Sequence, residues 1–259
     1  SAARGVPVST ELILGLPGET AESYKAGIAY CVEHSIVYYV SLLTNLQNSE
    51  MNDKQYRELH DIKSIEMVDP SGDSTDDTND LVVAHSALTE QEYVDLVIWN
   101  QLVTCLYCYK TANHIIKALV EKGADCATLL DKIVSKLRTD SVVADYMAQY
   151  ANHVQDGTTY ALSANGVNEA DVYVITQLVS QTDEEQLAWW SLIDDNITLD
   201  DIVHQRLSIN RDYRNVVIKT KNRTYTSNAI PSRYSSWQAW LITTRWNNNA
   251  ERIVGENND

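Results

Sequence analysis

The segment Glu11–Thr20, ELILGLPGET, has the residue types and spacing to hold a ligand against the polypeptide backbone. Gly15 and Gly18 allow a close approach to main-chain atoms, and Pro17 stiffens the link between them. A short apolar run precedes this turn, and Thr20 can cap a helix that follows it. Because the active sites of βα-barrels lie at the C-terminal ends of the strands, the turn is a candidate binding element. The alternative interpretation is an ordinary strand-to-helix turn with a helix cap.

The four cysteines, at positions 31, 105, 108 and 126, are candidate metal ligands. Cys105 and Cys108 form a C-x-x-C whose thiols share one helix face, with His114 about two turns further on. The pattern allows an auxiliary iron–sulfur or zinc site, or two buried small apolar side chains. No C-x-x-x-C-x-x-C occurs in the sequence. Four cysteines do not make a disulfide framework in a chain of 259 residues, so the expected compartment is a reducing cytoplasm.

Oxygen-bearing side chains alternate along residues 69–80, DPSGDSTDDTND, as they do in calcium-binding loops. The glycine is fourth rather than sixth and Asp80 replaces the usual glutamate, so a solvated acidic loop is the other interpretation. The histidines show no metal-ligand spacing, and we expect each to be exposed or held by a local contact. They are His34, His60, His85, His114, His153 and His204. No metal site is predicted.

Charge is distributed unevenly along the chain, whose net charge is −16. Residues 206–252 contain nine Lys or Arg against Asp212 and Glu251, a net charge of +7, so the remainder carries −23. An acidic body argues against nucleic acid as the main partner. The basic segment also holds a cation–aromatic cluster that could bind an anionic or flat ligand, or pack against the body of the protein. This cluster consists of Arg233, Tyr234, Trp237, Trp240, Arg245 and Trp246.

The elements that must position these residues begin with a predicted strand at 6–15, a helix from Thr20 to His34 and a second strand at 36–44. Both strands are apolar over most of their length, as expected when helices cover one face and a barrel interior lies on the other. Two strands do not close a barrel, so we expect a further N-terminal barrel portion to complete the sheet.

The rest of the chain is predicted to be mainly helical. Residues 45–88 are polar and irregular except for a short helix within 51–62, and a capping box at Thr89–Glu92 opens a helix from Glu90 to about Lys122. Later helices are predicted at 125–138, 140–153, 168–181, 183–194 and 235–254, an extended segment at 214–226, and helix starts at Thr182 and Thr198. No run of 18 apolar residues occurs, so a membrane partner is not expected.

Two of these segments resemble a known family. ELILGLPGET closely resembles the late barrel strand of radical S-adenosylmethionine (SAM) enzymes, especially the branch whose members often carry a cobalamin-binding domain. Residues 42–62, LLTNLQNSEMNDKQYRELHDI, resemble the segment after the sixth barrel strand of that branch. In that segment a turn, here Asn48-Ser49-Glu50-Met51 with Glu50 in place of the usual proline, precedes a tyrosine- and arginine-bearing helix. Residues 230–240, IPSRYSSWQAW, are similar to C-terminal regions of such proteins. The main resemblance covers residues 1–67.

The resemblance implies a site at the ends of the two strands. In radical SAM enzymes an apolar residue of this strand packs on the adenine of SAM, and the glycine beyond it leaves room for the cofactor. Those roles fall on Ile13 and Gly15. The acidic residue that often stands three positions after the glycine is replaced by Gly18, and Glu19 follows it. The implied cofactor-binding residues are Ile13, Gly15, Leu16, Pro17, Gly18, Leu43 and Thr44, and no catalytic residue is assigned.

The resemblance further implies an α/β fold, in which the last two βα units of a TIM-like radical SAM barrel are followed by a mostly α-helical C-terminal domain. The expected parts are the barrel portion at 1–67, an acidic linker at 68–88, a helical domain at 89–205 and a basic, aromatic-rich segment at 206–259. The helical domain would close over a small-molecule substrate.

The implied activity belongs to a larger enzyme. That enzyme would cleave SAM reductively at a [4Fe–4S] cluster, and the resulting 5′-deoxyadenosyl radical would abstract hydrogen from the substrate, in some members with methyl transfer from cobalamin. Because the cluster-binding cysteines are missing, this chain alone is expected to be inactive and to hold none of these cofactors. Its expected partner is the missing N-terminal barrel portion. The alternative is a non-enzymatic helical module that binds a protein through residues 90–250.

Overall fold

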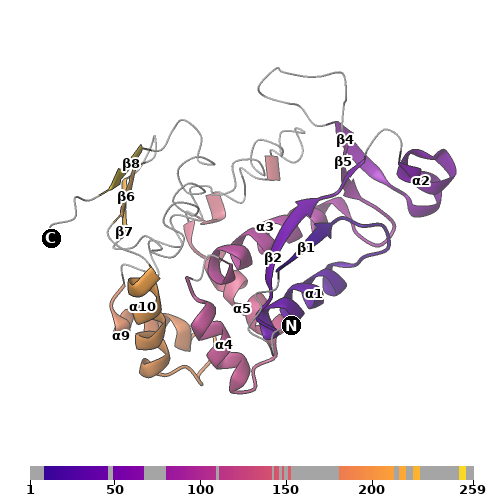
Figure 1. Ribbon diagram of the computed structural model, residues 1–259. Coiled ribbons are helices and arrows are strands. Elements are labelled where there is room, and N and C mark those ends of the chain that lie inside the picture. The colour runs from indigo at the N-terminus through magenta and orange to yellow at the C-terminus, as the bar shows by residue number, and fades with distance from the viewer. Residues whose placement is uncertain are drawn as a thin grey trace. The chain divides into compact units, whose positions relative to one another are not determined.

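The computed structural model describes residues 9–45, 49–66, 80–108, 111–141, 143–145, 148, 151–152, 181–212, 216–219, 224–227 and 251–254, with side chains as far as residue 205. These residues form helices and small sheets (Figure 1), which confirms the α/β class. The chain divides into two compact units. The first unit comprises Ser1–Asn100 with Met147–Leu162, and the second comprises Gln101–Tyr146 with Ser163–Asp259.

The first unit begins with the predicted strand, helix and strand. Strand β1 is Ser9–Leu14, helix α1 is Ala21–Glu33 and strand β2 is Val37–Leu42. The two strands pair in parallel, from Ser9↔Val37 to Leu14↔Leu42, and α1 contacts β2 (Figure 1). Thr20 caps α1 in a reciprocal pair of hydrogen bonds with Ser23, which explains why the helix begins directly after the turn.

A second sheet occupies a region that the sequence pattern marks as irregular. Its strands are β3 (Thr44–Asn45), β4 (Lys63–Glu66) and β5 (Asp80–Ala84), in the order β3-β5-β4 and antiparallel. The prediction for residues 45–88 is therefore wrong at β4 and β5, because short strands become stable only through their cross-strand partners. The predicted short helix is confirmed as α2, Lys54–His60, which follows a 3₁₀ turn at Glu50–Asn52.

The long helix predicted from Glu90 to about Lys122 is two helices. Helix α3 is Glu90–Tyr107 and helix α4 is Asn113–Glu121. Between them the Thr111 hydroxyl donates to the Cys105 carbonyl at 2.8 Å, and the Ala112 N–H donates to the Leu106 carbonyl at 2.9 Å. These bonds satisfy carbonyls at the end of α3. The break has no glycine or proline signal, so the apolar pattern alone does not show it.

The remaining helices of the second unit follow their predicted starts. Helix α5 is Cys126–Leu137, α9 is Asp183–Ser191 and α10 is Leu199–Asp212. Thr182 forms a capping box with Glu185, and the Thr198 hydroxyl pairs with the Asp201 carboxylate in the same way. The predicted helix at 140–153 is helical at each of its described residues from 141 onward. Nearly all of the helix predicted at 168–181 lies outside the described residues.

A third sheet lies near the C-terminus. Strands β6 (Val216–Lys219) and β7 (Thr224–Ser227) pair antiparallel within the segment predicted to be extended. Strand β8, Glu251–Val254, pairs with β6, so the helix predicted for 235–254 is wrong over its last four residues. The pairing of Ile253 and Val254 with the β-branched residues of β6 favours an extended backbone there. Residues 228–250 lie outside the described part.

Tyrosine and tryptophan supply the aromatic core, since the chain has no phenylalanine. In the first unit the buried rings are Tyr24, Tyr38, Tyr93 and Trp99, and in the second they include Trp190. Among the described residues, no helix has the length and apolar character needed to cross a bilayer.

Candidate functional site

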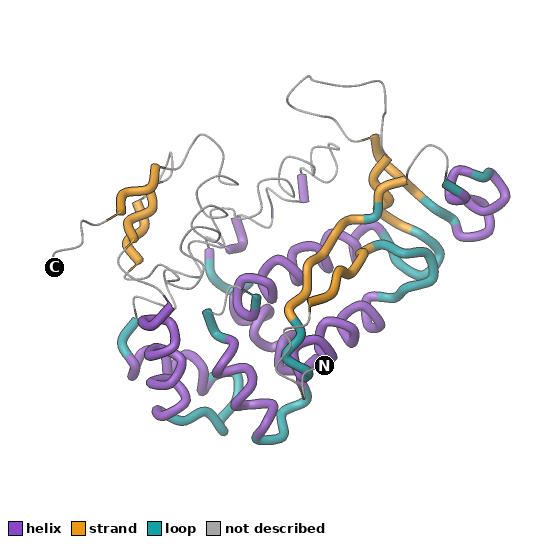
Figure 2. Tube along the Cα trace, in the orientation of Figure 1, coloured by secondary structure: helices purple, strands orange, loops and turns teal. Residues whose placement is uncertain are grey.

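The ends of β1 and β2 bring the two groups of predicted site residues together. Gly15, Leu16, Pro17 and Gly18 follow β1, while Leu43 and Thr44 follow β2. Parallel strands end at the same edge, and the Leu43 N–H donates to the Leu14 carbonyl at 2.9 Å, beyond the last register pair. Figure 2 shows the two strands running side by side into their loops. We call these six residues together with Ile13 the strand-end site.

The backbone conformation of Gly15 favours glycine. Its φ angle is +101°, a left-handed conformation that other residues adopt at a cost. A Cβ atom there would lie 3.5 Å from Leu43 Cβ, from Tyr93 Cε2 and from the Val82 carbonyl oxygen. A Cβ would therefore be in ordinary van der Waals contact, and only a larger side chain would press against Leu43, β5 and α3.

Gly18 differs from Gly15 in its surroundings. Its φ is +91°, and nothing lies within 4 Å of the position that a Cβ would occupy. The nearby side chains of Ile13 and Leu16 are 41% and 42% exposed, although both are apolar. The open part of the strand-end site therefore comprises the exposed residues Ile13 and Leu16 and the empty space beside Gly18. An apolar, flat ligand group could contact this surface.

Leu43 joins the site to the second predicted family segment. It is buried in a small core with Ile62 and Val82, against which Met51 and Tyr56 also pack. Thr44 is half-buried and pairs with Leu81. The turn before α2 is held by side-chain amides, since Ser49 Oγ donates to Asn45 Oδ1 at 3.0 Å and Asn45 Nδ2 donates to Asn52 Oδ1 at 2.6 Å.

Glu19 is the ionisable group next to the glycine turn. Its Oε2 atom is buried and has no hydrogen-bond partner among the described residues, and burial raises the pKa of its carboxyl. Burial, followed by the charge of Glu19, also raises the pKa of Tyr24. The Tyr24 hydroxyl donates to Asn100 Oδ1 at 3.2 Å. Sequence reasoning left the role of Glu19 open, because its burial depends on how the chain packs around it.

The other candidate ligands are not assembled into a metal centre. No group of three or more His, Cys, Asp or Glu residues among those described could hold a metal ion. Cys105 is buried and Cys108 half-buried, and none of the four cysteines forms a disulfide. The rings of His114 and His204 meet edge to face at 4.8 Å between centroids, a pairing that their sequence separation does not predict. Residues 69–79, His153 and the cluster from Arg233 to Trp246 lie outside the described residues.

His85 is the most enclosed of the described histidines. It is 5% exposed, and its Nδ1 accepts a hydrogen bond from the Ala87 N–H at 3.2 Å. Its Nε2 is buried without a partner among the described residues. Burial, and then the nearby His60, lower the pKa of His85. The ring is therefore held neutral in the turn between β5 and α3.

No family model matches the chain, and no curated protein matches it.

Proposed function

We propose that this chain is the C-terminal portion of a radical SAM enzyme, and that the strand-end site forms one wall of its SAM-adenosine site. In this proposal β1, α1 and β2 belong to the last two βα units of the barrel. The helical domain lies on the side where a small-molecule substrate binds. The whole enzyme is cytoplasmic, and many members of the same branch also bind cobalamin. The chain alone is inactive.

The observation that carries the proposal is the uncovered parallel sheet of the first unit. Parallel sheets are normally covered on both faces and contain more than two strands. Here β1 and β2 pair only with each other among the described residues. Their common face has three exposed apolar side chains, Ile13 at 41%, Val37 at 37% and Tyr39 at 50%. Such a sheet requires further strands and a covered interior, which the missing N-terminal barrel portion would supply.

The open part of the strand-end site fits an adenine ring. Ile13 and Leu16 offer exposed apolar surface, and the space beside Gly18 allows a ligand to reach the backbone. Leu43 and Thr44 follow β2 at the same end of the sheet, where the Leu43 N–H donates to the Leu14 carbonyl. The iron–sulfur cluster does not fit this chain, because the C-x-x-x-C-x-x-C segment is absent. The N-terminal portion would have to hold the cluster and supply the radical chemistry.

SAM binding measured by calorimetry tests the proposal. The isolated chain should bind SAM weakly or not at all. The same chain joined to its cluster-bearing segment and reconstituted anaerobically should bind SAM tightly. In that polypeptide Ile13→Ser should weaken SAM binding about tenfold, since an adenine face loses its apolar contact. Val37→Ser is the matched control: it changes the same sheet face at similar exposure, but four residues away along the strand pair, and should change binding less than twofold.

Two results would contradict this proposal. Tight SAM binding by the isolated chain would show that the chain is not a fragment of the site. An equal loss of SAM affinity in the Ile13→Ser and Val37→Ser variants would show that SAM affinity depends on the whole sheet face and not on its C-terminal end. The coding sequence upstream of Ser1 gives an independent check, because it should encode an in-frame C-x-x-x-C-x-x-C. A start codon directly before Ser1 would refute the enzyme interpretation.

The second candidate function is a helical module that binds a protein partner. One observation favours it: two lysines in the second unit stand beside an exposed leucine and have no acidic partner among the described residues. SAM binding separates the two functions, because a protein-binding module is not expected to bind SAM at the strand-end site.

A further inference from the structure

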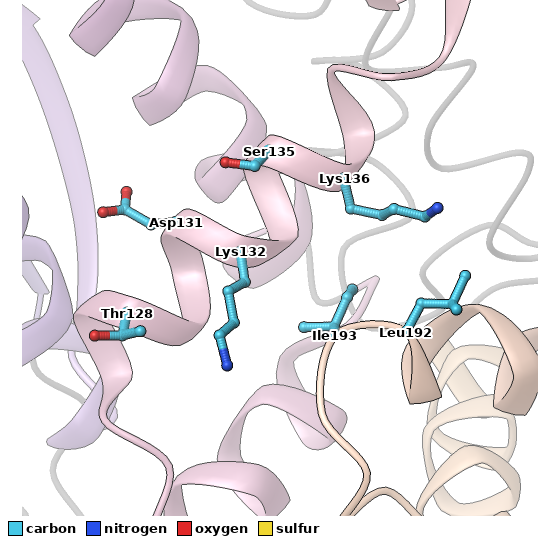
Figure 3. Close-up of a pocket in the computed structure, with 7 residues that line it drawn as sticks. All are labelled: Thr128, Asp131, Lys132, Ser135, Lys136, Leu192 and Ile193. Carbon is cyan, nitrogen blue, oxygen red and sulfur yellow. The ribbon is translucent and has the colours of Figure 1, made fainter.

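An open groove of about 610 Å³ lies in the second unit between α5 and the end of α9. One wall is α5, which contributes Thr128, Asp131, Lys132, Ser135 and Lys136, and the other is formed by Leu192 and Ile193. In Figure 3 the side chains of Lys132 and Lys136 extend on the side of Leu192 and Ile193, while Asp131 and Ser135, which also line the groove, point away from them in this view.

The two lysines form a small positive patch on an acidic chain, which the Asp131 carboxylate in the lining of the same groove offsets only in part. Neither has a hydrogen-bonded or ion-paired carboxylate among the described residues. Other lysines are engaged: Lys54 pairs with Glu58 and Lys122 with Asp201, while Lys25 lies over the ring of Trp99. In a chain with a net charge of −16, the patch is a local exception that would attract carboxylates.

The opposite wall of the groove is apolar. Leu192 ends α9 and is 71% exposed, and Ile193 beside it is buried. An inorganic anion would use the lysines but leave Leu192 in water. A peptide segment with carboxylates next to a leucine-like side chain would use both walls, and the open shape admits an extended or helical segment.

We propose that this groove, lined by Lys132, Lys136, Leu192 and Ile193, binds an acidic amphipathic segment of a partner protein. The carboxylates of the segment pair with the two lysines, and its apolar side chain covers Leu192. The site lies on second-unit residues and does not rest on the assignment of the strand-end site to SAM. In the second candidate function, this groove is the surface that contacts the protein partner.

Fluorescence anisotropy with the full chain tests this site. The probe is a fluorescein-labelled helical peptide of Glu, Leu and Ala, in which Glu residues flank one leucine stripe, and the control peptide has Gln at each Glu. The double variant Lys132→Glu/Lys136→Glu should weaken binding of the acidic peptide at least about tenfold, and Leu192→Ser several-fold. Lys63→Glu reverses another exposed lysine without an acidic partner among the described residues, and should change binding less than twofold.

Nuclear magnetic resonance of the unsubstituted chain gives a readout that does not depend on any variant. Addition of the acidic peptide should shift the amide signals of residues 128–136 and 192–193. Equal affinity for the Gln peptide, or equal loss with Lys63→Glu, would overturn the proposal. It would also be overturned if pyrophosphate displaced the peptide while Leu192→Ser had no effect, because the site would then be an anion site. If the unsubstituted chain self-associated and the lysine variants did not, the groove would bind a second copy of this chain, and the proposal of a partner protein would be wrong.

Discussion

The side chain of Gln205 accepts hydrogen bonds from the N-terminal N–H groups of α4, at 2.8 Å from the backbone nitrogen of His114 and 3.4 Å from that of Ile115. The N-cap residue of this helix, Ala112, has no side chain that could do so. At the other end of α4, Lys122 pairs with Asp201 of α10. Helix α10 therefore holds both ends of α4 and runs antiparallel to it.

Replacing Gln205 with leucine should destabilise the second unit. Gln205 is 1% exposed, so the variant would leave buried N–H donors without an acceptor, at a cost of about 1–3 kcal/mol. Urea unfolding followed by tryptophan fluorescence measures this loss. The control Gln91→Leu changes an exposed glutamine on α3 and should alter stability by no more than about 0.5 kcal/mol. Equal stability of the two variants would show that the Gln205 contact does not cap α4.

The two glycines of the strand-end site should respond differently to valine. Both have left-handed φ angles, so each substitution carries a similar backbone strain. Gly15→Val would also force its methyl groups against Leu43, Tyr93 and Val82, whereas Gly18→Val faces open space. Gly15→Val should therefore cost about 1–3 kcal/mol more than Gly18→Val in chemical unfolding. Equal losses would mean that the first unit does not pack around Gly15 as described.

Stability should fall in mild acid because of His85. The pKa of His85 is lowered in the folded state, so the unfolded chain binds more protons below its ordinary value of about 6.5. Its contribution to stability is present above that pH and is lost as the pH falls. His85→Asn keeps an acceptor for the Ala87 N–H and removes the titration, so urea midpoints between about pH 8 and about pH 5 should vary less in this variant. An unchanged pH dependence would contradict the role of His85.

The Tyr24 hydroxyl should contribute measurably to the first unit. Tyr24→Phe removes the donor to Asn100 Oδ1 and leaves that buried acceptor without it, at a cost of about 1–2 kcal/mol. Tyr30→Phe is the matched control on the same helix: Tyr30 is 56% exposed and its ring stacks on His34, a contact that phenylalanine keeps. The control should change stability by no more than about 0.5 kcal/mol. If both variants unfolded at the same denaturant concentration, the hydrogen bond would have no net effect.

Local signals predicted much of the fold, and non-local contacts account for what they missed. The caps at Thr20, Thr89 and Thr182 span three residues each, so the sequence alone shows where their helices begin. The end of α3 depends on Thr111 reaching back to Cys105, and no residue type marks it. Strand β5 is stabilised by pairing with β3 on one side and β4 on the other, and neither partner adjoins it in the sequence.

The candidate site shows the same division. A parallel βα unit places the residues after its two strands at one edge, and the apposition of Gly15 and Leu43 follows from that pattern. The environment of Glu19 and the bond between Tyr24 and Asn100 require helix α3 to pack against α1. That contact joins residues 76 positions apart, and neither periodicity nor spacing indicates it.

Glu19 should oppose His85 in its pH dependence. Its pKa is raised in the folded state, so the folded chain binds more protons than the unfolded chain above the ordinary value of about 4.5. The contribution of Glu19 is therefore present below that pH and is lost as the pH rises through the raised pKa. Glu19→Gln removes the charge from the buried oxygen, and should stabilise the protein near neutral pH by no more than about 1 kcal/mol, because the group is partly solvated.

The difference between Glu19→Gln and the unsubstituted protein should shrink as the pH falls toward about 4.5. Urea unfolding at a series of pH values measures it, with Glu22→Gln as the control for an exposed carboxyl of α1. Destabilisation by Glu19→Gln at neutral pH would show that the carboxylate has a favourable partner in the folded chain. Glu19 would then be a structural anchor of the turn after β1, rather than a buried charge available to a ligand of the strand-end site.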